Sequence, residues 1–460
     1  MMKQADLGLQ PQCILLLALS FASWLAFSFP SSAEDRGFDS LIEIEAELEN
    51  FPPPSENTLP WPTPQHQETY VPDAPSVAEE QSESEPPRDP QPVAEESVDQ
   101  FELGLVGEAL YSHSPGVFQN HLSPILALRF APDIIFFSKI NFIDGGVDRH
   151  PGGSSPQGEI LLESAFLEWS LGSSQRSSAW APRKAQRRNQ QDLGEGLEQR
   201  FLIGLQLLPM GLVNPTSEPN SYLSVQPPET ETFIIPQRWS EMGVLYTANH
   251  GEWLSYRVGV FNSLDSSRLR PDSYLLRGTQ GGRAKAKDLS GLVGLQIGSQ
   301  SFRLGGSYLY GHTGHGLDGL GFSPLHLYEV NFSAHWGSLL HLSGLFTEAR
   351  LSQATAIEIL NNTSTFGLRA TGFYVQAAVD LLYNNGSVAL PLFVRLERYN
   401  LHQEVAPGET PDPRLNRQNI TYGLNWQPRP QLTFKLDYQD RRNRLEQEPG
   451  VFSLGLSFVY

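Results

Sequence analysis

The chain has 460 residues and a formal net charge of −19, and 39% of its residues are hydrophobic. That length can supply one large core or more than one domain. The charge is uneven, because eighteen acidic and only two basic residues lie between positions 34 and 100 and the rest is nearly neutral. The charge therefore gives no support for nucleic-acid binding. No internal segment reaches the ~20 apolar residues that a membrane-spanning helix requires.

Residues 1–33 have the pattern of a secretory signal peptide. Lys3 precedes an apolar run over 14–29, and a small-residue triplet, 31–33, follows it. We expect cleavage after that triplet. Cys13 is the only cysteine and leaves with the signal, so the mature chain has neither disulfides nor thiolate metal sites. A closed barrel's continuous ladder of backbone hydrogen bonds would stabilise such an exported protein instead.

Residues 34–100 form an acidic arm. Apolar residues recur at helical spacing over 41–51, which allows a short amphipathic helix. From 52 to 100 the chain is rich in Pro, Glu, Ser and Gln and has few large apolar residues. Such a segment cannot bury enough surface to offset its ordering entropy, so we expect it to be disordered or extended. A solvated periplasmic spacer is the favoured interpretation, and docking on a periplasmic partner is the alternative.

From Phe101 onward, large apolar residues alternate with small or polar ones in segments of about ten residues. This pattern predicts strands with one apolar face and one polar face, as in a barrel with a lipid-facing exterior and a wet lumen. A soluble β-sandwich would show the same alternation. We expect about sixteen strands, near 101–111, 123–131, 133–142, 158–171, 200–209, 240–248, 252–262, 289–299, 301–311, 325–336, 338–350, 367–383, 388–400, 417–427, 431–440 and 450–460.

The lengths of the connections favour the barrel over the sandwich. Tight turns are expected at 131–133, 249–251, 299–301, 337–338, 384–386 and 428–430, and longer polar links at 263–288, 312–324, 351–366, 401–416 and 441–449. Short links that alternate with long ones are typical of transmembrane β-barrels, with brief periplasmic turns and long outer loops. An even strand number places both termini in the periplasm. The basic connection 172–199 breaks this rule and has no explanation in the sequence.

The last ten residues, 451–460, alternate strictly and end on Tyr460 with no tail. Large apolar side chains occupy every second position, and Ser453, Gly455 and Ser457 lie on the other face. This segment resembles the closing strand of bacterial outer-membrane β-barrels. The chain as a whole therefore predicts an all-β fold, with the barrel over 101–460.

The link from 210 to 237 is the longest of the outer loops and has the most telling sequence. Five prolines around it would hold it in a fixed shape. Together with its flanks and part of the fourth strand, it resembles the phosphate-selective porin O and P type family. The resemblance is dense over roughly 160–260 and rests on Ala165-Phe166-Leu167-Glu168-Trp169, Leu208-Pro209-Met210-Gly211-Leu212-Val213-Asn214, Glu218-Pro219, Pro227-Pro228-Glu229-Thr230-Glu231 and the segment 234–244.

The resemblance implies that this third outer loop folds into the lumen and narrows it, and that the protein is a homotrimer. Phosphate or another small anion is then one possible solute. The expected loop residues at the constriction are Glu218, Glu229 and Glu231, and a pair between Arg238 and Glu241 would tether the loop to the wall. The side chains expected on the lumen wall are Arg129, Lys139, Arg200, Arg257, Arg303, Arg395 and Lys435, with Glu102, Glu108, Glu241, Glu329, Asp380, Glu397 and Asp437.

Seven cations against seven carboxylates argue for a weakly selective channel, because a selective anion pore needs rings of Arg or Lys without balancing acids. In the fourth strand, Glu163 and Glu168 fall on opposite faces by simple parity, which predicts a β-bulge or a slip there. Two histidines, His312 and His315, have a chelating spacing, but no third ligand is fixed nearby, so exposed loop histidines are the preferred interpretation.

We expect an outer-membrane porin of a Gram-negative bacterium that lets small hydrophilic or ionic solutes diffuse passively, without a cofactor or metal. Its expected partners are membrane lipid, lipopolysaccharide and the barrel-assembly machinery, with no nucleic acid. A basic outer loop, 263–288, could contact lipopolysaccharide phosphates or simply be a solvated surface. No catalytic constellation is evident, so no enzyme is expected. The alternative is a non-transport surface protein, an adhesin or receptor built on the barrel.

Overall fold

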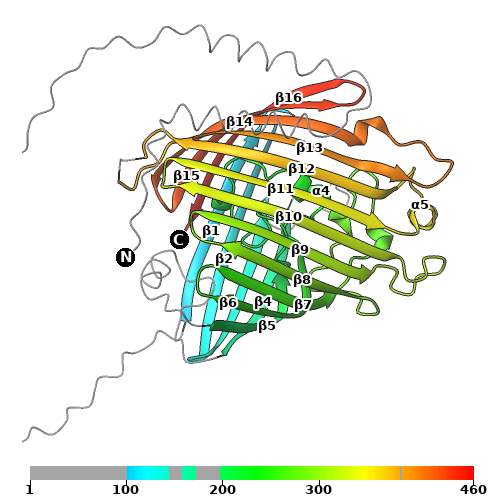
Figure 1. Ribbon diagram of the computed structural model, residues 1–460, viewed down its shortest axis with the longest axis horizontal. Coiled ribbons are helices and arrows are strands. Elements are labelled where there is room, and N and C mark those ends of the chain that lie inside the picture. The colour runs from blue at the N-terminus through cyan, green and yellow to red at the C-terminus, as the bar shows by residue number, and fades with distance from the viewer. Residues whose placement is uncertain (1–100, 115, 145–157, 172–196, 384–385) are drawn as a thin grey trace, which may run out of the picture. The chain divides into compact units, whose positions relative to one another are not determined.

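The computed structural model describes residues 101–114, 116–144, 158–171, 197–383 and 386–460. These residues contain sixteen antiparallel strands that close into a barrel (Figure 1). The expected signal, the acidic arm and most of the basic connection lie outside the described residues. The strands are β1 Phe101–Ser112, β2 Val117–Ala131, β3 Ile134–Ile143, β4 Glu159–Leu171, β5 Leu197–Leu207, β6 Ser240–His250, β7 Leu254–Asn262, β8 Leu289–Gly298, β9 Phe302–His312, β10 Pro324–Trp336, β11 Leu340–Leu351, β12 Gly367–Asp380, β13 Pro391–Val405, β14 Asn416–Arg429, β15 Leu432–Asn443 and β16 Gln447–Val459.

Each strand pairs with its neighbours in the sequence, and β16 closes the ring against β1. The closing register places Val106 opposite Val459 and Ser112 opposite Ser453. At the end of the chain, the Tyr460 backbone exchanges hydrogen bonds of 2.8 and 2.9 Å with that of Leu105. The prediction that the terminal strand closes a barrel of about sixteen strands is therefore confirmed.

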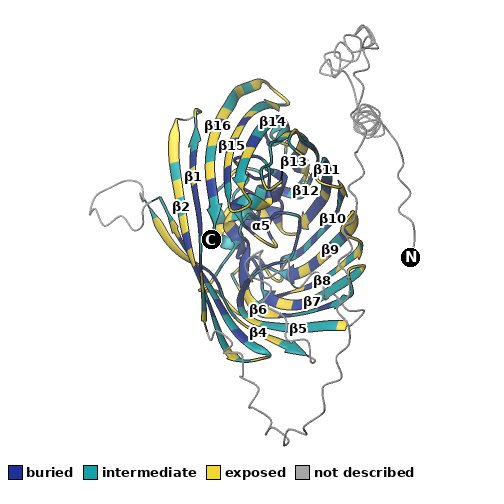
Figure 2. Cartoon of the chain, turned by 90° about the vertical axis from the view of Figure 1, so that its left-hand side faces the viewer, coloured by how far each residue is buried: buried dark blue, intermediate teal, exposed yellow. Residues whose placement is uncertain are grey.

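Most strands carry apolar side chains on the outer face and polar ones on the inner face. Figure 2 shows exposed and buried residues alternating along the strands. On β10, Val330 is 51% exposed, whereas its neighbours Glu329 and Asn331 are 1% and 7% exposed. Outward residues of the same kind include Ile203, Val244, Val258, Val260, Val293, Leu295, Leu304, Leu392, Tyr422, Leu436 and Leu454. An exposed apolar belt around a closed barrel is the arrangement that a bilayer accommodates, because no backbone edge is left unpaired in lipid.

The bulge expected in the fourth strand is present. Lys139 pairs with Ser164 and Ile140 pairs with Leu162, so Glu163 is the extra residue of β4. The bulge resets the alternation, and both Glu163 and Glu168 become buried. It explains how two carboxylates at opposite parity reach the same face of the sheet.

The two ends of the barrel differ in their connections. We call the end where β1 begins and β16 finishes the turn end, and the opposite one the loop end. Turn-end links include the short 132–133, 251–253, 299–301, 337–339 and 430–431, whereas the loop end has 208–239, 263–288, 313–323, 352–366 and 406–415. The alternation of short and long links is confirmed.

Two expected loops are shorter than the sequence indicated. β13 continues to Val405, and β15 and β16 continue until only 444–446 separates them. On the loop-end side of a register shift in the β15–β16 pairing, Arg441 pairs with Glu448 and Arg442 with Gln447. The added parts of β15 and β16 are polar on both faces, so they lack the apolar alternation by which strands were recognised. The added part of β13 does carry apolar residues, Leu401 and Val405, beside polar ones. The backbones of all three still pair.

The helices are short and lie in the loops. They are η3 Pro219–Ser221, α4 Thr230–Phe233, η4 Ser266–Arg268, η5 Leu276–Gly278, α5 Ala354–Asn361 and η6 Pro413–Leu415. Among the described residues, no helix is long and apolar enough to cross a membrane.

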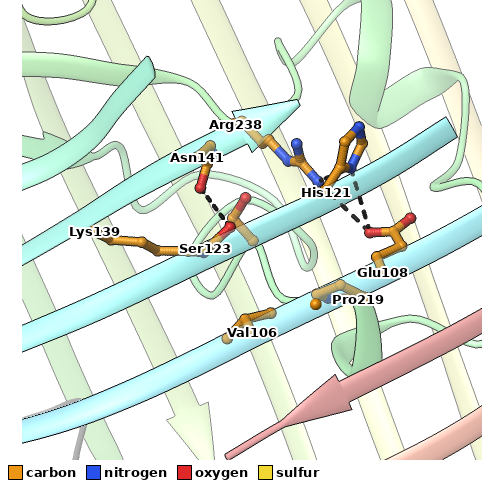
Figure 3. Close-up of a pocket in the computed structure, with 10 residues that line it drawn as sticks. Val106, Glu108, His121, Ser123, Lys139, Asn141, Pro219 and Arg238 are labelled. Carbon is orange, nitrogen blue, oxygen red and sulfur yellow. Dashed lines mark hydrogen bonds and ion pairs between the residues drawn. The ribbon is translucent and has the colours of Figure 1, made fainter. Parts of the chain in front are cut away.

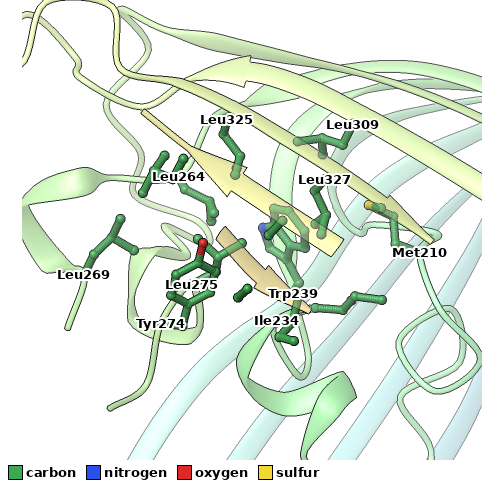
Figure 4. Close-up of a cluster of buried hydrophobic side chains, with 14 of the residues drawn as sticks. Met210, Ile234, Trp239, Leu264, Leu269, Tyr274, Leu275, Leu309, Leu325 and Leu327 are labelled. Atoms are coloured by element: carbon green, nitrogen blue, oxygen red, sulfur yellow. The ribbon is translucent and has the colours of Figure 1, made fainter. Parts of the chain in front are cut away.

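A large apolar cluster joins the loops to the inner wall. Ile234 and Trp239 of the 208–239 loop are buried together with Leu264 and Tyr274 of the 263–288 loop. Figure 4 shows these side chains gathered with Leu309, Leu325 and Leu327 of β9 and β10. Because these inward residues of β9 and β10 are apolar, they can hold two long loops against the wall of the barrel.

Candidate functional site

The 208–239 loop, called loop 3 below, is pinched at its base and folds into the barrel. The Leu208 N–H donates to the Trp239 carbonyl at 2.8 Å, so the two ends of the loop lie side by side. The Asn214 amide reinforces this base, because its Nδ2 donates to the Leu208 carbonyl at 2.7 Å and its Oδ1 accepts from the Trp239 N–H at 2.8 Å. Loop 3 is thus a closed unit and not a slack connection.

Glu231 is the internal hub of loop 3. Its Oε2 accepts from the N–H groups of Leu212 and Val213 at 2.8 and 2.9 Å, and its Oε1 accepts from the Tyr374 hydroxyl of β12 at 2.5 Å. Gly211 has φ +77°, and a Cβ there would lie 2.1 Å from that carboxylate. Burial raises the pKa of Glu231 to about 7, although these hydrogen bonds oppose the shift. The residue therefore ties the start of the loop both to α4 and to the barrel wall.

One side of loop 3 is clamped by the inward side chains of β14, β15 and β16. Lys435 Nζ donates to the carbonyls of Pro219, Tyr222 and Ser224 at 2.5, 2.7 and 3.0 Å, and it lies 4.1 Å from the centre of the Tyr222 ring. Segment 219–225 makes three further hydrogen bonds to these strands. The Val225 N–H donates to the Asp437 carboxylate, the Asn425 amide donates to the Leu223 carbonyl, and the Ser457 hydroxyl donates to Asn220 Oδ1. The segment is thus bound along its backbone and cannot drift across the lumen without breaking several contacts.

The next part of the loop is held by charged groups. Glu397 of β13 accepts from the Thr230 N–H at 2.6 Å. Glu229 lies 3.8 Å from Arg417 and 3.4 Å from Arg441, and both arginines also pair with Glu448 at 3.7 and 3.5 Å. These four charged side chains are 16–25% exposed, so they form a ring that water can reach at the loop end.

Loop 3 also contacts β1, β2 and β4. Arg238 lies 3.7 Å from Glu108 of β1 and 3.1 Å from His121 Nδ1 of β2. Ser217 donates to Glu163 of the bulge at 3.2 Å. In the closed ring of strands, β4 and β12 lie opposite each other, and loop 3 contacts Glu163 of β4 through Ser217 and Tyr374 of β12 through Glu231, so the loop bridges the lumen between these two strands.

A polar cavity lies between loop 3 and β1–β3 (Figure 3). The cavity is small, with room for about one water molecule, and it opens partly to solvent. Lys139 pairs with Glu163 at 2.6 Å on its wall, and Ser123 donates to Asn141 at 2.7 Å. Both charge signs therefore line the same narrow space.

Three of the seven cations expected on the lumen wall are paired with carboxylates. Lys139 and Arg395 pair with Glu163 and Glu397, and Arg200 pairs with both Glu168 and Glu198. The other assigned partners are uncharged: Arg129 donates to the Pro132 carbonyl, Arg257 to Ser307, and Lys435 to the loop carbonyls. Arg303 is exposed on β9.

Most of the predicted loop residues lie within this bridge, but one predicted pair is wrong. Glu229, Glu231 and Arg238 all contact the wall, and the Glu218 carbonyl closes the η3 turn by accepting from Ser221. The pair between Arg238 and Glu241 does not form: Glu241 instead accepts from the Trp239 indole at 3.2 Å and the Gln280 N–H at 2.9 Å. Arg238 has φ +54°, so its backbone leaves the extended path of β6 and its side chain turns to β1.

The structure adds residues that charge counting missed. Tyr374 and Tyr399 contact loop carboxylates from β12 and β13, and Asn214 closes the loop base. The alternation along the strands could predict that the two tyrosines point inward, but it could not predict which loop residues they contact. The expectation that both histidines are exposed in a loop is wrong: His312 is half-buried at the end of β9 and contacts the Tyr310 hydroxyl, and His315 is buried against Gln280 and the Leu264 carbonyl.

Comparison with known proteins gives only distant matches. No family model matches the chain. An uncharacterized protein of Aquifex aeolicus (strain VF5) is 23% identical over 390 residues, which is 78% of this chain and 79% of the relative. Similar solved structures include Salmonella typhi OmpF in complex with daunomycin (11% identity, TM-score 0.47, 78% of this chain and 97% of that chain), Pseudomonas putida OprB (11%, 0.48, 78% and 94%) and an anion-selective porin from Comamonas acidovorans (10%, 0.43, 78% and 98%). At these identities and TM-scores, the functional conclusion rests on the residues of this chain.

Proposed function

We propose that the protein is an outer-membrane porin through which small hydrophilic or ionic solutes diffuse passively. The observation that carries this proposal is loop 3, which crosses the interior of a closed barrel and is bound to both walls by polar side chains. A loop so placed narrows a lumen to a defined cross-section, whereas a core that only had to be stable would be filled with apolar residues. The solute's own gradient would drive transport, without a cofactor.

The proposed constriction is the cavity between loop 3 and β1–β3. Its wall carries Glu108, Lys139 and Arg238, and both cations are paired, Lys139 with Glu163 and Arg238 with Glu108. Paired charges of opposite sign produce no strong preference for one ion, so we propose weak selectivity. Transport of phosphate, which the resemblance to the phosphate-selective O and P type family would imply, is a narrower proposal that this charge balance does not favour.

The surroundings of the barrel are part of the same proposal. The outward apolar belt supports insertion in the outer membrane of a Gram-negative bacterium. With sixteen strands, both ends of the barrel sequence lie at the turn end, which we assign to the periplasm together with the acidic arm. Insertion by the barrel-assembly machinery, contact with lipopolysaccharide and assembly as a homotrimer complete the proposed setting.

The decisive experiment is planar-bilayer conductance of the refolded mature protein, with reversal potentials measured in asymmetric salt. Steady ohmic steps are expected, and deletion of 213–235 should raise the conductance several-fold because it removes the bridge across the lumen. A matched control deletes residues 407–410 of another loop, three of which are exposed, and should leave the conductance unchanged. Equal conductance with and without 213–235 would show that loop 3 does not limit the pore.

A second candidate function is an adhesin or receptor built on the barrel. The apolar cluster between loop 3, the 263–288 loop and β9–β10 favours it, because a core packed inside the loop end can seal a barrel. Correctly folded protein without conductance steps, in which deletion of 213–235 also opens no channel, would support this second function.

A further inference from the structure

We propose that His335 and His341 form a binding site for a divalent transition-metal ion at the turn end of the barrel interior. The two residues lie directly opposite each other on β10 and β11, beside the short turn 337–339. Their imidazole rings are stacked, with 4.3 Å between the ring centroids and 5° between the ring planes. This pair lies away from loop 3 and takes no part in the proposed constriction.

The nitrogens of the two rings point the same way. Both Nε2 atoms contact one hydroxyl, Ser333 Oγ, at 3.1 and 3.3 Å. A metal ion bound to two imidazoles has metal–nitrogen distances of about 2.0–2.1 Å, which places the nitrogens roughly 3–4 Å apart. The ring spacing is close to that value, but the lone pairs of stacked rings are parallel, so both rings must tilt toward each other before the two Nε2 atoms can bind one ion.

The hydrogen bonds to Ser333 leave both imidazoles in the neutral form, and a metal ion can replace the hydroxyl. One hydroxyl can donate to one Nε2 and accept from the other, so the arrangement suits two neutral imidazoles, the form that binds metals. An ion that replaces the Ser333 contact would require both Nε2 atoms as lone-pair donors and both ring protons on Nδ1. Water would complete the coordination, because no group of three or more His, Cys, Asp or Glu suited to a metal occurs among the described residues.

Imidazole ligands select the class of ion. They suit Cu²⁺, Ni²⁺ and Zn²⁺, whereas Mg²⁺ and Ca²⁺ prefer oxygen ligands. Affinity should follow the general order in which Cu²⁺ binds more tightly than Ni²⁺ or Zn²⁺. One neighbour opposes binding: Arg303 of β9 lies opposite Ser333 in the register, and its positive charge repels a cation. Removal of this charge should therefore strengthen metal binding, which gives a second test of the site.

The test is Cu²⁺ binding to the refolded mature protein in detergent, followed by electron paramagnetic resonance. We expect a species with coupling to two nitrogens, which is lost in the His335→Ala/His341→Ala double variant. The matched control, His312→Ala/His326→Ala, removes two histidines of β9 and β10 at the loop end and should retain that species. An unchanged spectrum in the first double variant would overturn the proposal, and the result does not depend on whether the barrel conducts.

A charge variant separates chelation from a merely structural role of the histidines. Arg303→Gln should tighten Cu²⁺ binding, because it removes the opposing charge and leaves both imidazoles in place. Weaker or unaltered binding in Arg303→Gln would contradict the assigned site. Heat-modifiable migration on gels should be the same for all variants, since these side chains lie at the water-exposed rim.

Discussion

At the scale of single residues, buried charged side chains inside this barrel form hydrogen bonds with specific groups of loop 3. Lys435 has no carboxylate within ion-pair distance among the described contacts, yet three loop carbonyls accept from its Nζ. Glu231 likewise has no cation, but two N–H groups and a hydroxyl donate to it. Such groups are stable when buried because each lone pair or proton is used. They position loop 3 more than they attract ions.

The carboxyl of Glu231 predicts a pH dependence with a definite sign. Its pKa is raised by burial from 4.5 to about 7, so between these values the folded protein binds a proton that the unfolded chain has released. The stabilisation from this group therefore falls as pH rises from about 4.5 to about 7. The difference in unfolding free energy between wild type and Glu231→Gln should shrink by about 2–3 kcal/mol between pH 5 and pH 8.

Urea unfolding in detergent at the two pH values measures that difference. Every other titrating group is common to the two proteins, so its contribution cancels. A difference in unfolding free energy that stays constant from pH 5 to pH 8 would show that Glu231 keeps an ordinary pKa, and hence that loop 3 is not closed around it.

At the scale of elements, loop 3 behaves as a clamped bridge, and Lys435 is its strongest single contact with β15. Lys435→Met keeps the length of the side chain but leaves three carbonyls without their donor, and each unpaired buried group costs roughly 1–3 kcal/mol. Segment 219–225 should then leave the wall. Chymotrypsin should cleave after Tyr222 faster in this variant than in wild type, in a measurement that is independent of conductance.

The control for this experiment is Lys287→Met, which changes an exposed lysine of the 263–288 loop. It removes the same charge without touching loop 3, so its cleavage rate at Tyr222 should equal that of wild type. Similar protection in Lys435→Met would mean that the prolines and the base around Asn214 hold the loop without the clamp.

The elements also show which features the sequence could and could not predict. The strands could be predicted from the local alternation of apolar and polar residues. The bulge at Glu163 could be predicted because Glu163 and Glu168 would otherwise lie on opposite faces. The inserted loop could be predicted from the family resemblance. The loop-end parts of β15 and β16 were missed, because their polar residues leave no apolar period, and the end of β13 was assigned to a loop although Leu401 and Val405 lie on it. The partner of Arg238 could not be predicted either, since it depends on how the loop folds back onto β1, a contact between distant parts of the chain.

At the scale of the whole molecule, the barrel depends on one seam between its first and last strands. Every other pair of neighbouring strands is joined through the chain, but β1 and β16 must find each other across the entire barrel sequence. Such a non-local contact forms late and slowly, because its loop-closure entropy is the largest of all the pairings. The register at this seam should therefore be especially sensitive to side-chain fit.

Gly107 provides that test, since it lies opposite Phe458 at the seam. A Cβ at this position would lie 2.3 Å from atoms of the Phe458 ring, so Gly107→Val should obstruct closure and lower the fraction of heat-modifiable folded barrel. Ala109→Val, on the same exposed face of β1, adds similar bulk away from that ring and should fold normally. Adding Phe458→Ala to Gly107→Val should restore folding, because it removes the ring that the valine meets. Failure of this double variant to recover would locate the defect in the strand itself and not in its fit to β16.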